Sequence, residues 1–364
     1  MRERRTTVVG TAVLACGLLA ATGPAEPAPG GGRDVVFVAN AEDGTVTAVD
    51  AETFEVLHQL DVVPDGDTAE PGEDDPFQAL LGQQLVEAAG GENLAQDQDL
   101  SPDGRTLYVS RGHRGDVAAF DLATGELLWK SPVDGIRADH ATLSADGTRL
   151  YVSSLTTDVV EVFDTADGTI VGSAATGEWP HDNHLSADGA RLYNASIGNI
   201  VTPWEAREAR AELPGVPSPY QLRIIDTATL ETLETFEFDR GIRPFALNDD
   251  ETRMYAQLSE LHGVIEYDLE AGEERRRLEL PIDDGVTEDD YSFEAPHHGL
   301  ALSADGGTLC LAGRASDYVA LVDVATFEAT AIVDVGDMPS WALTTPDGEH
   351  CVAANTGSGT VSFV

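Results

Sequence analysis

One ten-residue pattern recurs along this chain of 364 residues and limits what it can fold into. The segments share a polar turn followed by an apolar stretch, and they are SPDGRTLYVS (101–110), SADGTRLYVS (144–153), SADGARLYNA (186–195), NDDETRMYAQ (248–257), SADGGTLCLA (303–312) and TPDGEHCVAA (345–354). The shortest spacing is about 42 residues, and 35–60 match the second half of the unit, which indicates a seventh unit starting near residue 30. Such a period is typical of solenoids, propellers and repeat arrays.

Each unit predicts four short strands joined by Asp-Gly and Ala-Thr-Gly turns. The 36 glycines and 18 prolines of the chain fit many short strands better than long helices. Because a four-stranded unit of this length cannot bury both faces alone, the units are expected to pack around an axis as blades. The sequence therefore predicts an all-β fold, a single seven-bladed β-propeller of four-stranded antiparallel blades over residues 34–364. The first unit lacks its first strand and the last ends after its third, so we expect both termini to close the ring.

The first 33 residues have the pattern of an export signal followed by a Pro/Gly-rich spacer. MRERR is basic, and the apolar run from Val8 to about Ala21 is too short to span a membrane. We therefore predict an extracytoplasmic protein that is either secreted or lipid-anchored at the cell surface. The string VLAC predicts lipid attachment at Cys16, and the alternative is ordinary cleavage near residues 21–28, which removes this cysteine.

The composition excludes several function classes. The chain has 65 acidic and 21 basic residues, and its formal net charge of −44 repels the phosphates of nucleic acids and anionic lipid surfaces. We therefore expect no nucleic-acid partner, and membrane contact only through Cys16. Three cysteines exclude a disulfide-dense scaffold and every four-cysteine metal site. The strings CxxCH, GxSxG, HExxH, GxGxxG and the Walker motif are absent, so no common catalytic signature assigns an enzyme class.

Cys310 and Cys351 stand at corresponding strand positions of adjacent units. Export favours a disulfide between them. However, corresponding residues of neighbouring blades point in the same rotational sense and not toward each other. The sequence therefore favours two buried thiols, and a bridge would need a difference in register, which the shorter hairpin before Cys351 could supply.

The repeats resemble YVTN-type β-propellers over nearly all of residues 34–364. Two stretches, GIRPFALNDDETRMYAQLSELHGVIEYD (241–268) and APHHGLALSADGGTLCLAGRASDYVALVD (295–323), are similar to an exported bacterial subgroup that is common in actinobacteria and has no assigned activity. More distant propellers include lactonases, an amine-dehydrogenase subunit and the haem domain of nitrite reductases. The resemblance implies the fold, whereas an activity inferred from fold likeness alone is only an association.

Three units are longer than the 42-residue period, and the surplus locates three insertions. They are residues 65–93, with a short helix expected near 77–89, residues 198–219 and residues 282–294. The first and third follow the outermost strand of a blade, and the second joins its two middle strands. Because these connections emerge on the same side of an up-and-down blade, all three lie on one face, here called the inserted face. Long loops on a rigid scaffold are where binding sites usually form.

Polar residues gather where the first strand of each blade enters the central channel from the inserted face. The predicted ligand-binding residues are Asp97, Asp99, Asp139, His140, His181, Asp182, His184, Arg243, His297 and His298. Imidazole and carboxylate at close range suit a divalent transition metal, and the predicted ligands are His140, Asp182 and His184. The same groups suit general acid–base chemistry. The structural alternative is that they satisfy buried backbone groups and water at the channel mouth.

The sequence favours a binding protein that uses its inserted face to recognise a small molecule or a protein partner. One alternative is a metal-assisted hydrolase or lactonase-like enzyme with a His/Asp site at the channel mouth. A further alternative is a redox accessory protein that holds haem or quinone noncovalently. Beyond a divalent metal, which the His/Asp group suits, no cofactor is predicted.

Overall fold

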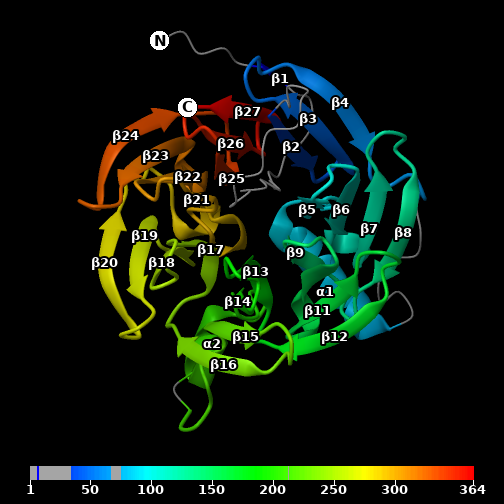
Figure 1. The fold of residues 1–364 in the computed structure, drawn as a ribbon. Helices are drawn as coiled ribbons and strands as arrows, with labels where there is room; N and C mark the ends of the chain where they lie inside the picture. The colour runs from blue at the N-terminus through cyan, green and yellow to red at the C-terminus, as the bar shows by residue number, and fades with distance from the viewer. Residues whose placement is uncertain (1–5, 8–33, 67–74, 212) are drawn as a thin grey trace.

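In a computed structural model the chain forms seven small antiparallel sheets arranged around a central axis (Figure 1). The structure describes residues 6–7, 34–66, 75–211 and 213–364. The predicted all-β seven-bladed propeller is confirmed. The leader predicted over residues 1–33, with Cys16, lies outside the described residues apart from Thr6 and Thr7. Within the described part of the chain, no helix is both long and apolar enough to span a membrane.

The blades follow one another in sequence order around the axis. The first blade contains β2 (Val35–Asn40), β3 (Thr45–Asp50) and β4 (Val56–Asp61). The second and third contain β5 (Asp97–Leu100), β6 (Thr106–Arg111), β7 (Asp116–Asp121), β8 (Leu127–Pro132), β9 (Ala138–Leu143), β10 (Arg149–Ser154), β11 (Val159–Asp164) and β12 (Ile170–Ala175). The fourth and fifth contain β13 (Pro180–Leu185), β14 (Arg191–Ser196), β15 (Gln221–Asp226), β16 (Thr232–Glu237), β17 (Ile242–Leu247), β18 (Arg253–Leu258), β19 (Gly263–Asp268) and β20 (Glu273–Glu279). The last two contain β21 (Leu300–Leu302), β22 (Thr308–Gly313), β23 (Tyr318–Asp323), β24 (Glu328–Asp334), β25 (Pro339–Thr344), β26 (Cys351–Asn355) and β27 (Thr360–Phe363).

The recurring turn has a local physical cause. In the second blade the hydroxyl of Ser101 donates to Oδ1 of Asp103 at 2.7 Å and accepts from the backbone N–H of Thr106 at 2.9 Å. Such side-chain bonds to the nearby backbone hold a tight reversal between two strands. The same serine–aspartate contact is present in the third blade between Ser144 and Asp146. The repeated pattern therefore marks the link between the first and second strands of a blade.

The ring closes between the first and seventh blades. The first blade has three strands, and its Val36 and Val38 pack against Leu343 and Val352 of the seventh. The seventh blade holds β25, β26 and β27, and its fourth strand is β1 (Thr6–Thr7), with Thr6 opposite Val361. Residues from both ends of the chain therefore meet at the closure, as expected.

The three insertions contain the elements that leave the propeller pattern. The first holds helix α1 (Pro76–Ala89), which confirms the predicted helix. The side chain of Asp75 accepts from the N–H of Phe77, a capping bond that satisfies one of the unpaired groups at the helix start. The second insertion holds α2 (Trp204–Ala211), and the third holds two short 3-10 turns, η3 (Glu288–Asp290) and η4 (Ser292–Glu294).

Cys310 and Cys351 form a disulfide between the sixth and seventh blades, with their Cα atoms 5.7 Å apart. The preference for two free thiols was therefore wrong. Cys351 pairs with Thr344 at the last position of β25, as Leu309 pairs with Leu302 in the sixth blade, whereas Cys310 stands one residue further along. Because successive side chains of a strand point to opposite faces, this offset of one residue turns the two cysteines toward each other.

Replacing both cysteines with alanine is expected to lower the free energy of unfolding by about 2–4 kcal/mol, the usual range for a lost disulfide. Alanine suits the apolar surroundings, which include Ala312, Val319 and Ala342. The measurement is thermal unfolding with and without a reductant. The reductant should lower the melting temperature of the natural chain and leave the double variant unchanged. Equal melting temperatures for the natural chain in both conditions would contradict the prediction.

Candidate functional site

Six blades each place one residue at the same position at the entrance of their innermost strand. Each of these residues stands five positions before the first residue of the recurring turn, and they are Gln96, Asp139, His181, Arg243, His298 and Ser340. All six are buried and line one cavity of about 640 Å³. That volume is typical of sites for small organic ligands.

All three insertions contribute residues to the wall of this cavity. The first contributes Glu87 and the segment 88–93, the second contributes Ile200, and the third contributes residues 290–293. Further lining residues are Glu42, Arg137, His140, Leu155, Ile197, Arg314, Met338, Thr356 and Gly357. The wall is therefore mixed, with apolar side chains beside charged and polar groups.

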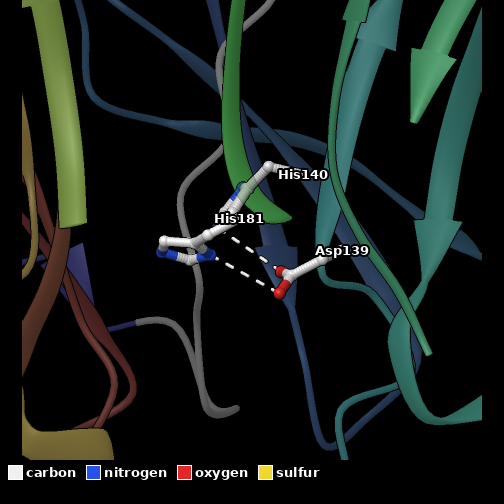
Figure 2. Close-up of side chains that lie close together, drawn as sticks. All are labelled: Asp139, His140 and His181. Carbon is white, nitrogen blue, oxygen red and sulfur yellow. Dashed lines mark ion pairs between the residues drawn. The ribbon is translucent and has the colours of Figure 1, made fainter. Parts of the chain in front are cut away.

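A buried cluster of carboxylates and histidines lies where the inner strands of the third and fourth blades meet (Figure 2). Ligand-capable atoms of Asp139, His140 and His181 all lie within 4.8 Å of one another. Oδ2 of Asp139 is 3.4 Å from Nδ1 of His181, and its Oδ1 is 3.7 Å from Nε2 of His140. The amide of Gln96 donates to Oδ1 of Asp139 at 2.6 Å. Asp139 therefore links both histidine rings to the second blade.

His140 is held in place by contacts on both sides of its ring. Its Nδ1 lies 3.1 Å from Oδ2 of Asp97, and Trp341 stacks on it with ring centroids 4.4 Å apart. Burial by itself would lower the pKa of His140. The hydrogen bond and charge of Asp97, with the charges of Asp139 and Asp182, outweigh this effect and raise the pKa of His140 to about 9. The ring is therefore a buried cation at neutral pH.

His181 and His298 approach each other across the channel, from the fourth and sixth blades. Their Nε2 atoms are 3.2 Å apart, and Nδ1 of His298 lies 2.8 Å from the carbonyl oxygen of Ser340. Burial lowers the pKa of both rings, so each is neutral at pH 7. Gly299, with φ of +149°, permits this placement of His298, because a Cβ there would stand 2.7 Å from the backbone carbon of Trp341.

Three arginines line the cavity of this strongly acidic protein. Burial lowers the pKa of Arg137, of Arg243 and of Arg314, the last two to about 10, and the charge of Arg243 further lowers the pKa of Arg314. Nη2 of Arg314 donates to the hydroxyl of Ser292 at 3.1 Å, and its Nε has no partner among the described residues. No carboxylate forms an ion pair with Arg314 in the described part of the chain. Arg137 and Arg243 each lie 3.9 Å from a carboxylate, that of Asp139 and that of Glu294, so Arg314 is the cavity arginine that a bound anion would stabilise most.

The third insertion is fixed over the cavity by arginines. Arg243 donates to the carbonyl of Phe293, and Arg207 forms an ion pair with Glu294. Phe293 and Glu294 have φ values of 53° and 58°, an uncommon conformation for residues other than glycine. Strained backbone of this kind persists only where surrounding contacts enforce it, and it concentrates at ligand sites.

The predicted candidates separate into two groups. Asp139, His140, His181, Arg243 and His298 line the cavity, whereas Asp97, Asp99, Asp182, His184 and His297 do not. Asp97 supports His140, as described above. Asp182 pairs with His184 at 3.3 Å and accepts from the N–H of Phe245 at 3.1 Å. Burial, with the charge of Asp97, raises the pKa of Asp99 to about 7, and Nε2 of His297 lies 2.9 Å from the hydroxyl of Tyr318.

The predicted metal triplet is not brought together as expected. Among the described residues, the group whose ligand atoms lie within 4.8 Å of one another joins His140 to Asp139 and His181, not to Asp182 and His184. The reason is strand geometry. Asp139 and His181 stand at equivalent positions of adjacent blades, whereas His184 stands three residues further along the channel.

Several lining residues were not predicted. Gln96 and Ser340 could have been found by their spacing, because they stand as far before the turn as Asp139 and His181. Arg137 and Arg314 lie outside the innermost strands, and their sequence positions carry no comparable signal.

Comparison with known proteins supports the fold. Residues 113–212 match the family model described as outer membrane protein assembly factor BamB. No curated protein sequence matches the chain significantly. Among solved structures, a chain of hydrazine synthase from Kuenenia stuttgartiensis superposes with a TM-score of 0.67 over 96% of this chain and 99% of that chain, at 19% identity. This protein is a seven-bladed β-propeller with a BamB-like repeat region. At 19% identity the structural likeness establishes the fold alone.

Proposed function

We propose that this propeller is a binding protein for a small organic anion, which it holds in the cavity of the inserted face. The observation that carries the proposal is Arg314, a cation that lines the cavity beside Arg243 and has no ion-pair partner among the described residues. Burial and the charge of Arg243 lower the pKa of Arg314. A carboxylate or other oxyanion would neutralise this charge and would accept from Nε of Arg314.

The apolar part of the wall defines the rest of the ligand. Leu155, Ile197, Ile200 and Met338 line the same cavity, with Phe293 from the third insertion. An apolar part of the ligand that packs against these side chains is removed from contact with water. This transfer adds affinity in proportion to the apolar area buried. The preferred ligand class is therefore an organic acid with an apolar body, rather than inorganic phosphate or sulfate.

We propose an extracytoplasmic location for this binding function. Its support is the leader pattern of residues 1–33 together with the disulfide between Cys310 and Cys351, because disulfides persist mainly in oxidising compartments. The mature N-terminus of the protein made in its own host, measured by mass spectrometry, tests the leader and shows whether Cys16 carries a lipid.

The ligand proposal predicts a difference between acids and matched neutral compounds. Benzoate should raise the melting temperature of the full chain and benzamide should not, because only the acid neutralises the arginines. Arg314→Gln should weaken benzoate binding by about 10- to 100-fold, as expected for lost hydrogen bonds to a charged group. Binding is measured by calorimetry and by the shift in melting temperature.

Arg277→Gln provides the matched control. Arg277 lies on outer strand β20, pairs with Glu274 at 2.7 Å and does not line the cavity, so this variant changes net charge equally and should bind benzoate as the natural chain does. The proposal is wrong if a panel of aromatic and aliphatic acids gives no binding. It is equally wrong if the Arg314 and Arg277 variants bind the acids alike.

A further inference from the structure

The His181–His298 pair cannot satisfy its hydrogen bonds with the protons of two neutral rings. The carbonyl oxygen of Ser340 only accepts, so the contact of 2.8 Å places the proton of neutral His298 on Nδ1. Its Nε2 then presents a lone pair to Nε2 of His181 at 3.2 Å. Both rings are more than nine-tenths buried.

Either neutral form of His181 leaves two acceptors in contact. With its proton on Nδ1, the ring donates toward Oδ2 of Asp139 at 3.4 Å, and two Nε2 lone pairs face each other. With its proton on Nε2, the ring donates to His298, and the Nδ1 lone pair faces the Asp139 carboxylate. Nδ1 of His181 has no hydrogen-bond partner among the described residues. A cation removes this contact, either a second proton on His181 or a metal ion between the two Nε2 atoms.

The separation of the two nitrogens fits a metal ion. Two imidazoles bound at 2.0–2.1 Å to a tetrahedral ion have nitrogens about 3.3 Å apart, and the observed distance is 3.2 Å. Asp139 and the Ser340 carbonyl contact the outer nitrogens, as carboxylates and carbonyls do behind metal-bound histidines. We propose that Nε2 of His181 and Nε2 of His298 bind a divalent transition metal of the zinc class. Both residues line the cavity, so the remaining coordination positions open toward it.

The neighbouring group of Asp139, His140 and His181 is less suited to a metal. The amide nitrogen of Gln96 lies 2.6 Å from Oδ1 of Asp139 and 3.2 Å from Nε2 of His140, so it fills the space between those two ligand atoms. Arg137 donates to Oε1 of Gln96 at 2.8 Å and fixes the amide in this orientation. The inferred metal position is therefore on the side of His181 that faces His298.

The test uses the full chain after chelator treatment and dialysis, with Zn²⁺ alone as the probe. Excess Mg²⁺ is present throughout, because this hard cation occupies surface carboxylates and competes poorly for imidazole. Calorimetry should give one equivalent of Zn²⁺ per chain. His298→Gln and His181→Gln should each weaken Zn²⁺ binding at least tenfold. His297→Gln is the matched control, since His297 is adjacent and buried but bonds Tyr318 and does not line the cavity.

A second measurement does not depend on whether the variants fold. Zn²⁺ should protect His181 and His298 of the natural chain from an imidazole-modifying reagent, and Co²⁺ should give the visible spectrum of a histidine-bound ion. The inference is overturned if the natural chain binds no Zn²⁺ in Mg²⁺, or if His298→Gln binds it as His297→Gln does. Loss of Zn²⁺ in His140→Gln but not in His298→Gln also overturns it. The benzoate experiment contains no metal, so the two proposals fail independently.

Discussion

Replacing Arg111 with methionine is expected to lower the free energy of unfolding by about 3–5 kcal/mol, as for a buried ion pair that loses one partner. The Arg111 side chain has no exposed surface. Its Nε and Nη2 donate to Asp116 at 2.6 and 2.5 Å, and its Nη1 donates to Asp65 at 2.7 Å and to the carbonyl of Val62. Methionine keeps much of the volume but leaves the buried Asp116 carboxylate without a counter-charge. Urea unfolding monitored by fluorescence measures the change.

Two further variants make this prediction specific. Arg105→Met removes an exposed arginine that lies 3.9 Å from Asp103, and it should cost less than about 1 kcal/mol, as surface pairs do. Arg111→Met combined with Asp116→Leu should recover most of the loss, because Asp65 keeps its ion pair with Lys130 at 2.6 Å and no unpaired buried charge remains. A loss below about 1 kcal/mol for Arg111→Met would contradict the prediction. Val62 directly precedes the first insertion and Asp65 begins it, so the same contacts anchor the segment that leads to α1.

The pair of His140 and Asp97 is expected to make stability fall as the pH rises toward 9. Asp97 and the neighbouring carboxylates raise the pKa of folded His140 from 6.5 to about 9. A raised histidine pKa contributes stability that is fully present below pH 6.5 and is lost as the pH passes through about 9. The difference corresponds to about 3 kcal/mol. Unfolding free energies measured from about pH 6 to about pH 10 should show this decline.

The variant Asp97→Asn removes the hydrogen bond and the charge of Asp97, which raise the pKa of His140 most. At about pH 6 the variant should be less stable than the natural chain by up to about 3 kcal/mol, and the difference should narrow as the pH passes through about 9. Asp97 also raises the pKa of Asp99, so the two chains are compared by their slopes above about pH 8, where Asp99 is ionised in both.

His184 also contributes stability that is lost as the pH rises, because Asp182 outweighs the effect of burial and raises the pKa of His184. This contribution persists in the Asp97→Asn variant. His58→Gln, an exposed change on outer strand β4, should follow the natural chain at every pH. If the free energy of unfolding of Asp97→Asn and of the natural chain changed with pH in parallel, Asp97 would not raise the pKa of His140, and the prediction would be contradicted.

The fold could be predicted because its information is local and repeated. The turn from Ser101 to Thr106 closes on its own side chains, so each copy of the pattern identifies one hairpin without knowledge of the rest. The helix at 76–89 could be expected for the same reason, since Asp75 caps it locally. The Cys310–Cys351 bridge was misjudged because it depends on pairing across two blades, where an offset of one residue reverses the outcome.

The site could be predicted only in part, because it is assembled by contacts between blades. The sequence placed candidates at the entrance of the innermost strands, and of these Asp139, His181 and His298 line the cavity. Which partners meet depends on the twist of each strand and the width of the channel. The sequence places His184 close to His181, but in space His181 faces His298, 117 residues further along the chain. Arg314 could not be predicted as a site residue, because its contact with Ser292 exists only once the third insertion is folded.

The six equivalent side chains on the cavity floor have a consequence for how this protein can change. Each stands five residues before the recurring turn, at the entrance of an inner strand, and comes from a different blade, and they are Gln96, Asp139, His181, Arg243, His298 and Ser340. The backbone at that step is set by the blade, so a different side chain there changes the contacts across the cavity while the propeller fold is kept. A library that varies these six codons alone would therefore sample many different binding chemistries on one unchanged scaffold.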